Sequence, residues 1–142
     1  MESTNKRIML QGEVYTYDFQ YTQEQVNQFA VISGDNNPIH LDAAYAANTP
    51  FKKPIVHGIL SMSIFSKYFG TIYPGEGTVY LKQIIEFLRP TYPDTQYQAI
   101  FTIKEIVSSR NKAVVDCKVI DSATGKPTMR GEAEIMHKEL IK

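Results

Sequence analysis

Residues 58 to 69 read Gly-Ile-Leu-Ser-Met-Ser-Ile-Phe-Ser-Lys-Tyr-Phe, and this apolar run sets the architecture that we expect for the chain. Its large apolar side chains cover nearly every side of a helical wheel, and only three serines and one lysine interrupt them. A helix of this composition is largely buried. We therefore predict a long central helix that begins at Gly58, with Gly70 as its C-terminal stop.

Strand-like segments lie on both sides of this helix in the sequence. Residues 12–21 are rich in Tyr, Val, Thr and Phe, and turn-forming residues separate four later candidates, at 78–88, 96–107, 112–121 and 127–137. An early strand, a buried helix and a run of strands is an α+β order. We expect one antiparallel sheet curled around the central helix, and one domain over residues 1–142.

Two short helices are predicted between the first strand and the central helix. Thr22 to Gln25 matches a capping box, which opens a helix that stops near Gly34. That helix is expected to carry four side chains inward: Val26, Phe29, Ala30 and Ile32. Asp42 is the expected N-cap of a second short helix over residues 43–47.

The segment between these two helices carries the candidate chemistry. It reads Ser33-Gly34-Asp35-Asn36-Asn37-Pro38-Ile39-His40, and its Gly, Asn and Pro residues favour turns over continuous helix or strand. Asp35 and His40 are therefore expected on one folded-back loop. A carboxylate beside an imidazole is the usual pair for moving a proton to and from water.

His57-Gly58 at the head of the central helix adds a third element. The first N–H groups of a helix have no partner inside it, and the helix dipole favours negative charge there. A glycine at this position lets a ligand approach the backbone closely. The sequence thus predicts an acid, an imidazole and an oxyanion-binding amide within reach of one another.

Other interpretations of these residues are structural or metal-binding. Asp35 alone could cap its own turn, and His40 alone could be a buried structural histidine. A metal site would need a third ligand such as Asp42 or His57, and the helical spacing of zinc proteases is absent, so proton transfer is favoured over metal binding. The single cysteine, Cys117, lies in an alternating segment and is interpreted as a strand residue rather than a nucleophile.

Composition excludes some partners. Fifteen Lys and Arg balance fifteen Asp and Glu, and the two signs are interspersed, so nucleic acid is not an expected partner. No run approaches the roughly 20 apolar residues of a membrane-spanning helix, and no signal peptide is recognisable. We expect a cytoplasmic protein that does not associate with membranes.

Two segments together carry a resemblance to a known family. Residues 29–42, which contain the D-x-N-P-x-H pattern, and residues 54–60, which contain the H-G pair, closely resemble the MaoC-like dehydratases, in particular the R-specific enoyl-CoA hydratases. Residues 74–81 and 86–90 are also similar to that family. The resemblance implies a hot-dog fold that acts as a homodimer in fatty acid metabolism. It also implies hydration of a trans-2-enoyl-CoA to an R-3-hydroxyacyl-CoA without metal or redox cofactor.

The same resemblance assigns roles to residues. It implies that Asp35 and His40 are the catalytic pair and that the Gly58 backbone N–H holds the thioester oxygen. We also consider three substrate-binding candidates: His57, Ser66 and Asn37. His57 could contact substrate or orient the loop, and Ser66 could form a hydrogen bond with the loop. Three cations could meet the phosphates of coenzyme A: Lys52, Lys53 and Arg89.

Two other functions are compatible with such a fold, because a fold does not determine a reaction. One is hydrolysis of an acyl-CoA thioester, and the other is a non-catalytic module that binds acyl thioesters.

Overall fold

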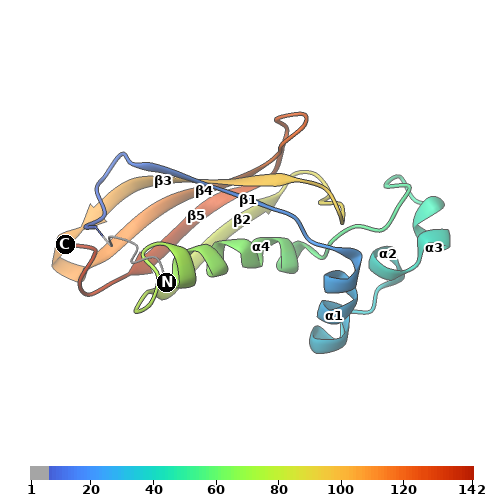
Figure 1. The fold of residues 1–142 in the computed structure, drawn as a ribbon, viewed down its shortest axis with the longest axis horizontal. Coiled ribbons are helices and arrows are strands. Elements are labelled where there is room, and N and C mark those ends of the chain that lie inside the picture. The colour runs from blue at the N-terminus through green and yellow to red at the C-terminus, as the bar shows by residue number, and fades with distance from the viewer. Residues whose placement is uncertain (1–6) are drawn as a thin grey trace.

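The computed structural model describes residues 7–142 and is built on a five-stranded antiparallel sheet (Figure 1). The strands are β1 (Val14–Phe19), β2 (Val79–Phe87), β3 (Tyr97–Val107), β4 (Lys112–Asp121) and β5 (Pro127–Met136). Their order across the sheet is β1-β3-β4-β5-β2, so that β1 and β2 form its two edges. All five strand predictions are confirmed, with ends that differ from the expected ones by no more than a few residues.

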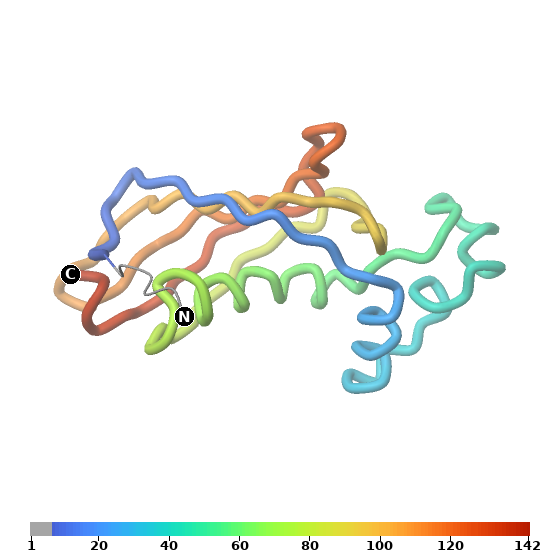
Figure 2. Tube along the Cα trace, viewed as in Figure 1, coloured from blue at the N-terminus to red at the C-terminus, as the bar shows by residue number. Residues whose placement is uncertain are grey.

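One long helix, α4 (Gly58–Lys67), runs along the sheet and packs its inward side against one face of it (Figures 1 and 2). Phe101 on β3 is the centre of the contact, since its ring stacks on Tyr68 at 4.3 Å between centroids and meets Phe65 and Phe69 edge-on. This aromatic cluster fixes the position of α4, and with it the position of the helix start at Gly58. The expected α+β order, with a helix packed against an antiparallel sheet, is confirmed. The helix is less buried than predicted, because only its sheet side is covered and Ile59 is 58% exposed.

The central helix differs from the prediction at its C-terminal end. Helical structure does not stop at Gly70 but continues as a π-helical turn, η1, over Tyr68–Ile72. Tyr68 and Phe69 are both buried in the aromatic cluster, and the wider turn keeps both rings on the sheet side. Packing here outweighs the local preference of glycine to end a helix.

Strand β4 holds the single cysteine of the chain. Cys117 is buried in the core, as its alternating sequence context predicts. Burial raises the pKa of its thiol, which keeps it protonated and unreactive.

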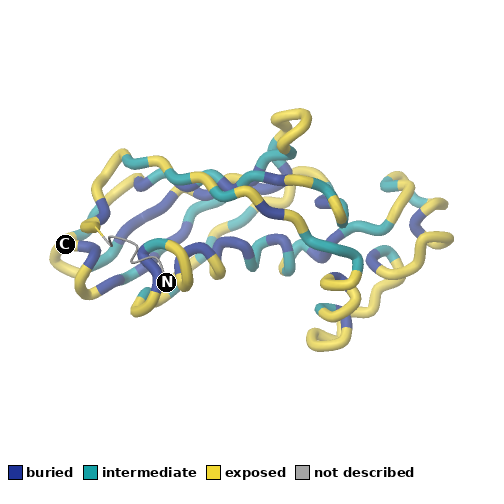
Figure 3. The backbone as a smooth tube through the Cα atoms, viewed as in Figure 1, coloured by how far each residue is buried: buried dark blue, intermediate teal, exposed yellow. Residues whose placement is uncertain are grey.

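Three short helices lie beyond one end of the sheet, at the opposite end from the C-terminus (Figures 1 and 2). They are α1 (Gln23–Ser33), α2 (Pro38–Leu41) and α3 (Ala43–Ala47). The predicted capping box of Thr22 with Gln25 is present, Gly34 ends α1, and Asp42 caps α3. Most of this segment is exposed, in contrast to the sheet and α4 (Figure 3).

Two predictions for this segment are wrong. Ile32, expected in the core, is 85% exposed, because α1 projects past the end of the sheet and only its Val26 and Ala30 side is covered. His40 does not lie in a turn but in the one-turn helix α2, which Asn37 caps and in which Pro38 is the first residue. Asn followed by Pro is a helix-start signal, and it outweighs the turn preference of the same residues.

Within residues 7–142, no helix is long and apolar enough to cross a membrane.

Candidate active site

The site forms where the three-helix segment meets the start of α4. Ile55 donates its N–H to the Ile39 carbonyl oxygen at 3.2 Å, and Val56 donates to the Thr91 carbonyl oxygen at 2.7 Å. Gln23 on α1 donates from its side chain to the carbonyl oxygen of His40 at 2.9 Å. These contacts tie α1, α2 and the entry to α4 into one unit.

His40 is buried, and its hydrogen bonds define its tautomer. Nδ1 lies 2.8 Å from the carbonyl oxygen of Ile55. A carbonyl only accepts, so Nδ1 carries a hydrogen and donates it, which leaves a lone pair on Nε2 in the neutral ring. Burial is the main influence on this group and lowers the pKa of His40 below its ordinary value. The neutral form, with Nε2 free to accept a proton, is therefore favoured.

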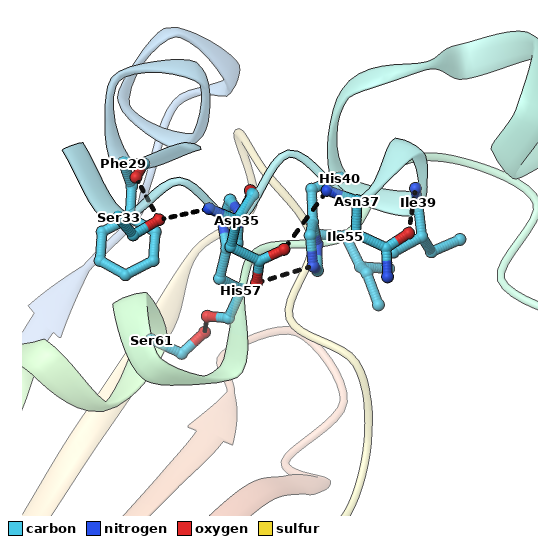
Figure 4. A network of polar contacts seen from close by, with 9 residues as sticks. All are labelled: Phe29, Ser33, Asp35, Asn37, Ile39, His40, Ile55, His57 and Ser61. Carbon is cyan, nitrogen blue, oxygen red and sulfur yellow. Dashed lines mark hydrogen bonds and ion pairs between the residues drawn. The ribbon is translucent and has the colours of Figure 1, made fainter. Parts of the chain in front are cut away.

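Asp35 faces that free nitrogen. Its carboxylate points toward the His40 ring, with Oδ2 at 4.0 Å from Nε2 (Figure 4). Oδ1 accepts a hydrogen bond from the Asn37 N–H at 3.3 Å, and the Asp35 N–H donates to Ser33 Oγ at 3.1 Å. The separation of Asp35 and His40 is too long for a direct hydrogen bond and has the length that a bridging water would span. The Asp35 side chain is 52% exposed, so water can reach it.

His57 lies behind this pair as the N-cap of α4. Its Nε2 is 2.9 Å from the backbone carbonyl oxygen of Asp35, and its ring stacks on the ring of His40 with 3.9 Å between centroids. Its Nδ1 is buried and has no hydrogen-bond partner. Because the His57 side chain does not cap α4, the first N–H groups of the helix, beginning with Gly58, have no side-chain partner.

Gly58 and His40 line the same pocket, which has a volume of about 390 Å³. Most of its wall is apolar, and Ser61 and Arg89 add polar groups. A Cβ on Gly58 would lie 3.0 Å from the ring of Phe87 at the end of β2, so glycine is needed for the close approach of these two elements. The pocket thus joins a buried neutral imidazole to an uncapped helix start.

The other sequence-predicted residues take different positions. Asn37 is exposed, and its side chain accepts from the Ile39 N–H as the cap of α2. Ser66 is exposed on α4, about 12 Å along the helix from Gly58, and does not line the pocket. Within this chain, therefore, the structure brings together Asp35, His40, His57 and Gly58 but not Ser66.

Of the three candidate cations, only Arg89 lines the pocket. It donates from Nη1 to the Pro127 carbonyl oxygen, while Lys53 places Nζ 4.6 Å from the centre of the Tyr92 ring. Lys52 is exposed.

A metal ion is the other ligand to consider, because Asp35, His40 and His57 place one potential ligand atom each within 4.8 Å of one another. Two imidazoles that bind one ion must direct their in-plane lone pairs at a single point. The two rings here are stacked with only 29° between their planes, so their lone pairs run side by side. Nε2 of His57 is also occupied by the Asp35 carbonyl oxygen. The arrangement therefore suits proton transfer better than metal binding, and Asp42 caps α3 instead of joining the group.

The His57 stack is the part of the site that sequence reasoning missed. The sequence placed His57 next to Gly58, but only the fold brings its ring against His40, 17 residues earlier in the chain. No local pattern could have indicated this contact.

Comparison with known proteins identifies the family of this chain and agrees with its fold. The family model described as "MaoC like domain" matches residues 7–124, and the chain belongs to that family. The chain is 35% identical over 111 residues to an (R)-specific enoyl-CoA hydratase of Aeromonas caviae, covering 78% of this chain and 82% of that protein. It is 33% identical over 115 residues to an (R)-specific enoyl-CoA hydratase of Rhodospirillum rubrum, covering 81% and 78%.

A solved structure gives the same result for the fold. An (R)-hydratase from A. caviae involved in PHA biosynthesis superimposes with a TM-score of 0.86 and 31% sequence identity, covering 91% of this chain and 97% of that chain. The fold is the hot-dog fold that the resemblance implied, with an open sheet.

Proposed function

We propose that this protein is an R-specific enoyl-CoA hydratase, which adds water reversibly to a trans-2-enoyl-CoA and forms an R-3-hydroxyacyl-CoA. The observation that carries the proposal is the free Nε2 of a buried neutral His40, which faces the Asp35 carboxylate and shares one pocket with the Gly58 amide. The relatives named as R-specific hydratases support both the reaction and its stereochemistry.

Asp35 and His40 divide the handling of water between them. Asp35 accepts a hydrogen bond from one hydrogen of the water molecule, and this hydrogen stays on the oxygen as it bonds to C3. The other hydrogen passes as a proton to Nε2 of His40, and His40 then delivers it to C2. The water molecule is fully consumed, and both side chains return to their starting protonation states. His40 needs a lone pair on Nε2 for the first step, which its bond to Ile55 provides.

Gly58 stabilises the charge that forms on the substrate. As the oxygen bonds to C3, negative charge develops on the thioester oxygen. The uncapped N–H groups at the start of α4 and the dipole of this helix favour an anion at that point. A fixed donor of this kind costs no reorganisation during the reaction.

The pocket suits an acyl thioester. Phe51, Ile55, Phe87 and Leu88 provide apolar walls for the acyl chain. Arg89 at the pocket, with the neighbouring Lys52 and Lys53, offers positive charge for the phosphates of coenzyme A. From the sequence we further propose that the enzyme works in the cytoplasm.

The open edge of the sheet supports a homodimer. Strand β2 pairs only with β5, and its other side is unpaired among the described residues. Four of its apolar side chains are at least 45% exposed: Val79, Leu81, Ile84 and Phe87. A long apolar edge strand is an aggregation hazard unless it is covered. Two-fold pairing of β2 with β2 of a second copy would cover it.

Substitution of the catalytic pair tests the mechanism. In Asp35→Asn and in His40→Ala, hydration of crotonyl-CoA should fall by about 10²- to 10⁴-fold. The measurement is the loss of the ultraviolet absorbance of the conjugated thioester, with circular dichroism to show that the variants fold. Asp42→Asn is the matched control, since it changes a neighbouring aspartate, and asparagine caps a helix equally well. Near-normal turnover in both pair variants would remove the mechanism.

Product analysis separates the competing reactions. A hydratase forms an R-3-hydroxyacyl-CoA and releases no free thiol, whereas a thioesterase releases coenzyme A that a thiol reagent detects. Tight binding of enoyl-CoA without either product would instead indicate a non-catalytic binding module.

A further inference from the structure

His57 contacts the site from three directions, although it does not line the pocket. Its Nε2 lies 2.9 Å from the Asp35 carbonyl oxygen, and one ring face stacks on His40 at 3.9 Å. Phe29 on α1 meets the ring edge-on, with 4.8 Å between centroids. The residue is 2% exposed. His57 is thus shielded from substrate and touches both members of the catalytic pair.

The hydrogen-bond pattern defines the orientation of this ring. The Asp35 carbonyl oxygen only accepts, so Nε2 of His57 carries a hydrogen and donates it. Nδ1 is buried and has no hydrogen-bond partner among the described residues. The donor of His57 is therefore committed to the Asp35 backbone, and its ring is held against the ring of His40.

We propose that His57 is a positioning residue, which anchors the backbone of Asp35 and provides an aromatic face on which the His40 ring lies while it takes and returns the proton. This inference rests on the proposed hydratase function. It also excludes a role for His57 in substrate contact.

The stack of His57 on His40 affects the expected pH dependence of kcat/KM. Two side chains with ionisable groups lie against His40, Asp35 from the loop and His57 from the start of α4, and the charged Arg89 lines the same pocket. Burial lowers the pKa of His40 most, and His57 lowers it further, because two adjacent imidazoles cannot both be charged at low cost. Hydration needs neutral His40, so kcat/KM should fall about tenfold per pH unit below that pKa, with a midpoint below the ordinary pKa of histidine.

Two variants of His57 separate its two tasks. His57→Phe keeps the stacked ring but loses the donor to Asp35, whereas His57→Gln keeps a donor at a similar reach but loses the ring. We expect kcat to fall about 10- to 100-fold in His57→Phe, because the Asp35 backbone is released, and less than tenfold in His57→Gln. In both variants the acid limb of kcat/KM should move to higher pH, since both lose the imidazole of His57, which lowers the pKa of His40.

His137→Gln is the matched control for loss of a buried histidine. His137 holds the C-terminal segment by accepting from the Glu139 and Leu140 N–H groups at 3.2 Å and 3.0 Å. This variant should be less stable but should keep the wild-type pH profile. An acid limb that does not move in either His57 variant would overturn the proposal, and so would a wild-type kcat in His57→Phe.

A measurement on the unmodified protein covers the case in which the variants do not fold. Nitrogen chemical shifts of the histidines should show a hydrogen on Nε2 of His57, held by its bond to Asp35, and a hydrogen on Nδ1 of His40. A neutral His57 with its hydrogen on Nδ1 would overturn the proposal, because that ring could not donate to the Asp35 backbone. This result does not depend on turnover, so a protein that failed to hydrate crotonyl-CoA would refute the proposed function but leave this test intact.

Discussion

The sheet with α4 and the α1–α3 segment are built on different principles. In the first region, strands β1–β5 and α4 bury a continuous apolar core centred on Phe101. In the second, three short helices are held by caps and single hydrogen bonds, and most of their side chains are exposed. Nevertheless the second region supplies Asp35 and His40. A rigid scaffold here positions a lightly packed segment that carries the proposed catalytic residues.

The two regions meet at the start of α4. The core fixes the helix axis. The helix start supplies Gly58, which lines the pocket, and His57, which contacts Asp35 and His40. The comparison therefore predicts that changes in the core act mainly on stability, whereas changes at the junction and in the loop act on turnover.

Truncation of the core should give the largest change in stability. Phe101→Ala removes a fully buried ring that contacts three aromatic side chains of α4 and η1, and we expect a loss of about 3–5 kcal/mol in the free energy of unfolding. Urea denaturation measures it. On the same strand, Lys104→Ala removes an exposed ion pair with Glu132 and should leave the free energy of unfolding almost unchanged. A large loss of kcat in the folded fraction of Phe101→Ala would break the distinction between the two regions.

A methyl group at the junction should act on turnover more than on stability. In Gly58→Ala the added Cβ would lie 3.0 Å from the Phe87 ring, which must shift and disturb the pocket. We expect kcat/KM for crotonyl-CoA to fall about 10- to 100-fold. Gly70→Ala is the control, because a Cβ there meets nothing within 4 Å. If Phe87 causes the loss, the double variant with Phe87→Leu should recover part of it, and a purely additive result would contradict this explanation.

The accuracy of the sequence-based predictions differs between the two regions for a physical reason. Strand positions depend on alternation within a few residues, so β4 was predicted with both of its ends correct. The chain past Lys67 depends on aromatic partners on β3, which local sequence does not reveal, and the predicted stop at Gly70 was therefore wrong. Ile32 was assigned to the core on helical periodicity alone, which cannot show that α1 projects beyond the sheet.

In the candidate site, too, features within one short segment could be predicted from the sequence, whereas contacts between distant segments could not. The pattern around Asp35 and His40 predicted that these two side chains lie close together, because both lie in one short segment. The tautomer of His40 depends on the Ile55 carbonyl oxygen, and its stack depends on His57, both of which lie far along the chain. Contacts of this kind arise from the fold and have no local signature.

Substitution of Gly34, for which we expect the smallest effect on activity, tests whether the backbone turn at this residue positions Asp35. Gly34 ends α1 in the left-handed conformation, with φ 77°, directly before Asp35. A Cβ there meets nothing within 4 Å, so Gly34→Ala should cost only the backbone penalty of about 1–2 kcal/mol. Gly125 in the turn between β4 and β5 has a similar φ of 72° and equally open surroundings. Gly125→Ala should therefore lose similar stability in thermal unfolding.

Only the loop variant should lose activity. Relief of the strain in Gly34→Ala would turn the chain at Asp35 and lengthen its separation from His40, so kcat should fall severalfold, while Gly125→Ala keeps the wild-type kcat. Gly34→Asn should restore much of both properties, since asparagine tolerates the left-handed conformation. Equal kcat values in Gly34→Ala and Gly125→Ala would mean that α2 and His57, rather than the turn at Gly34, determine where the Asp35 carboxylate lies.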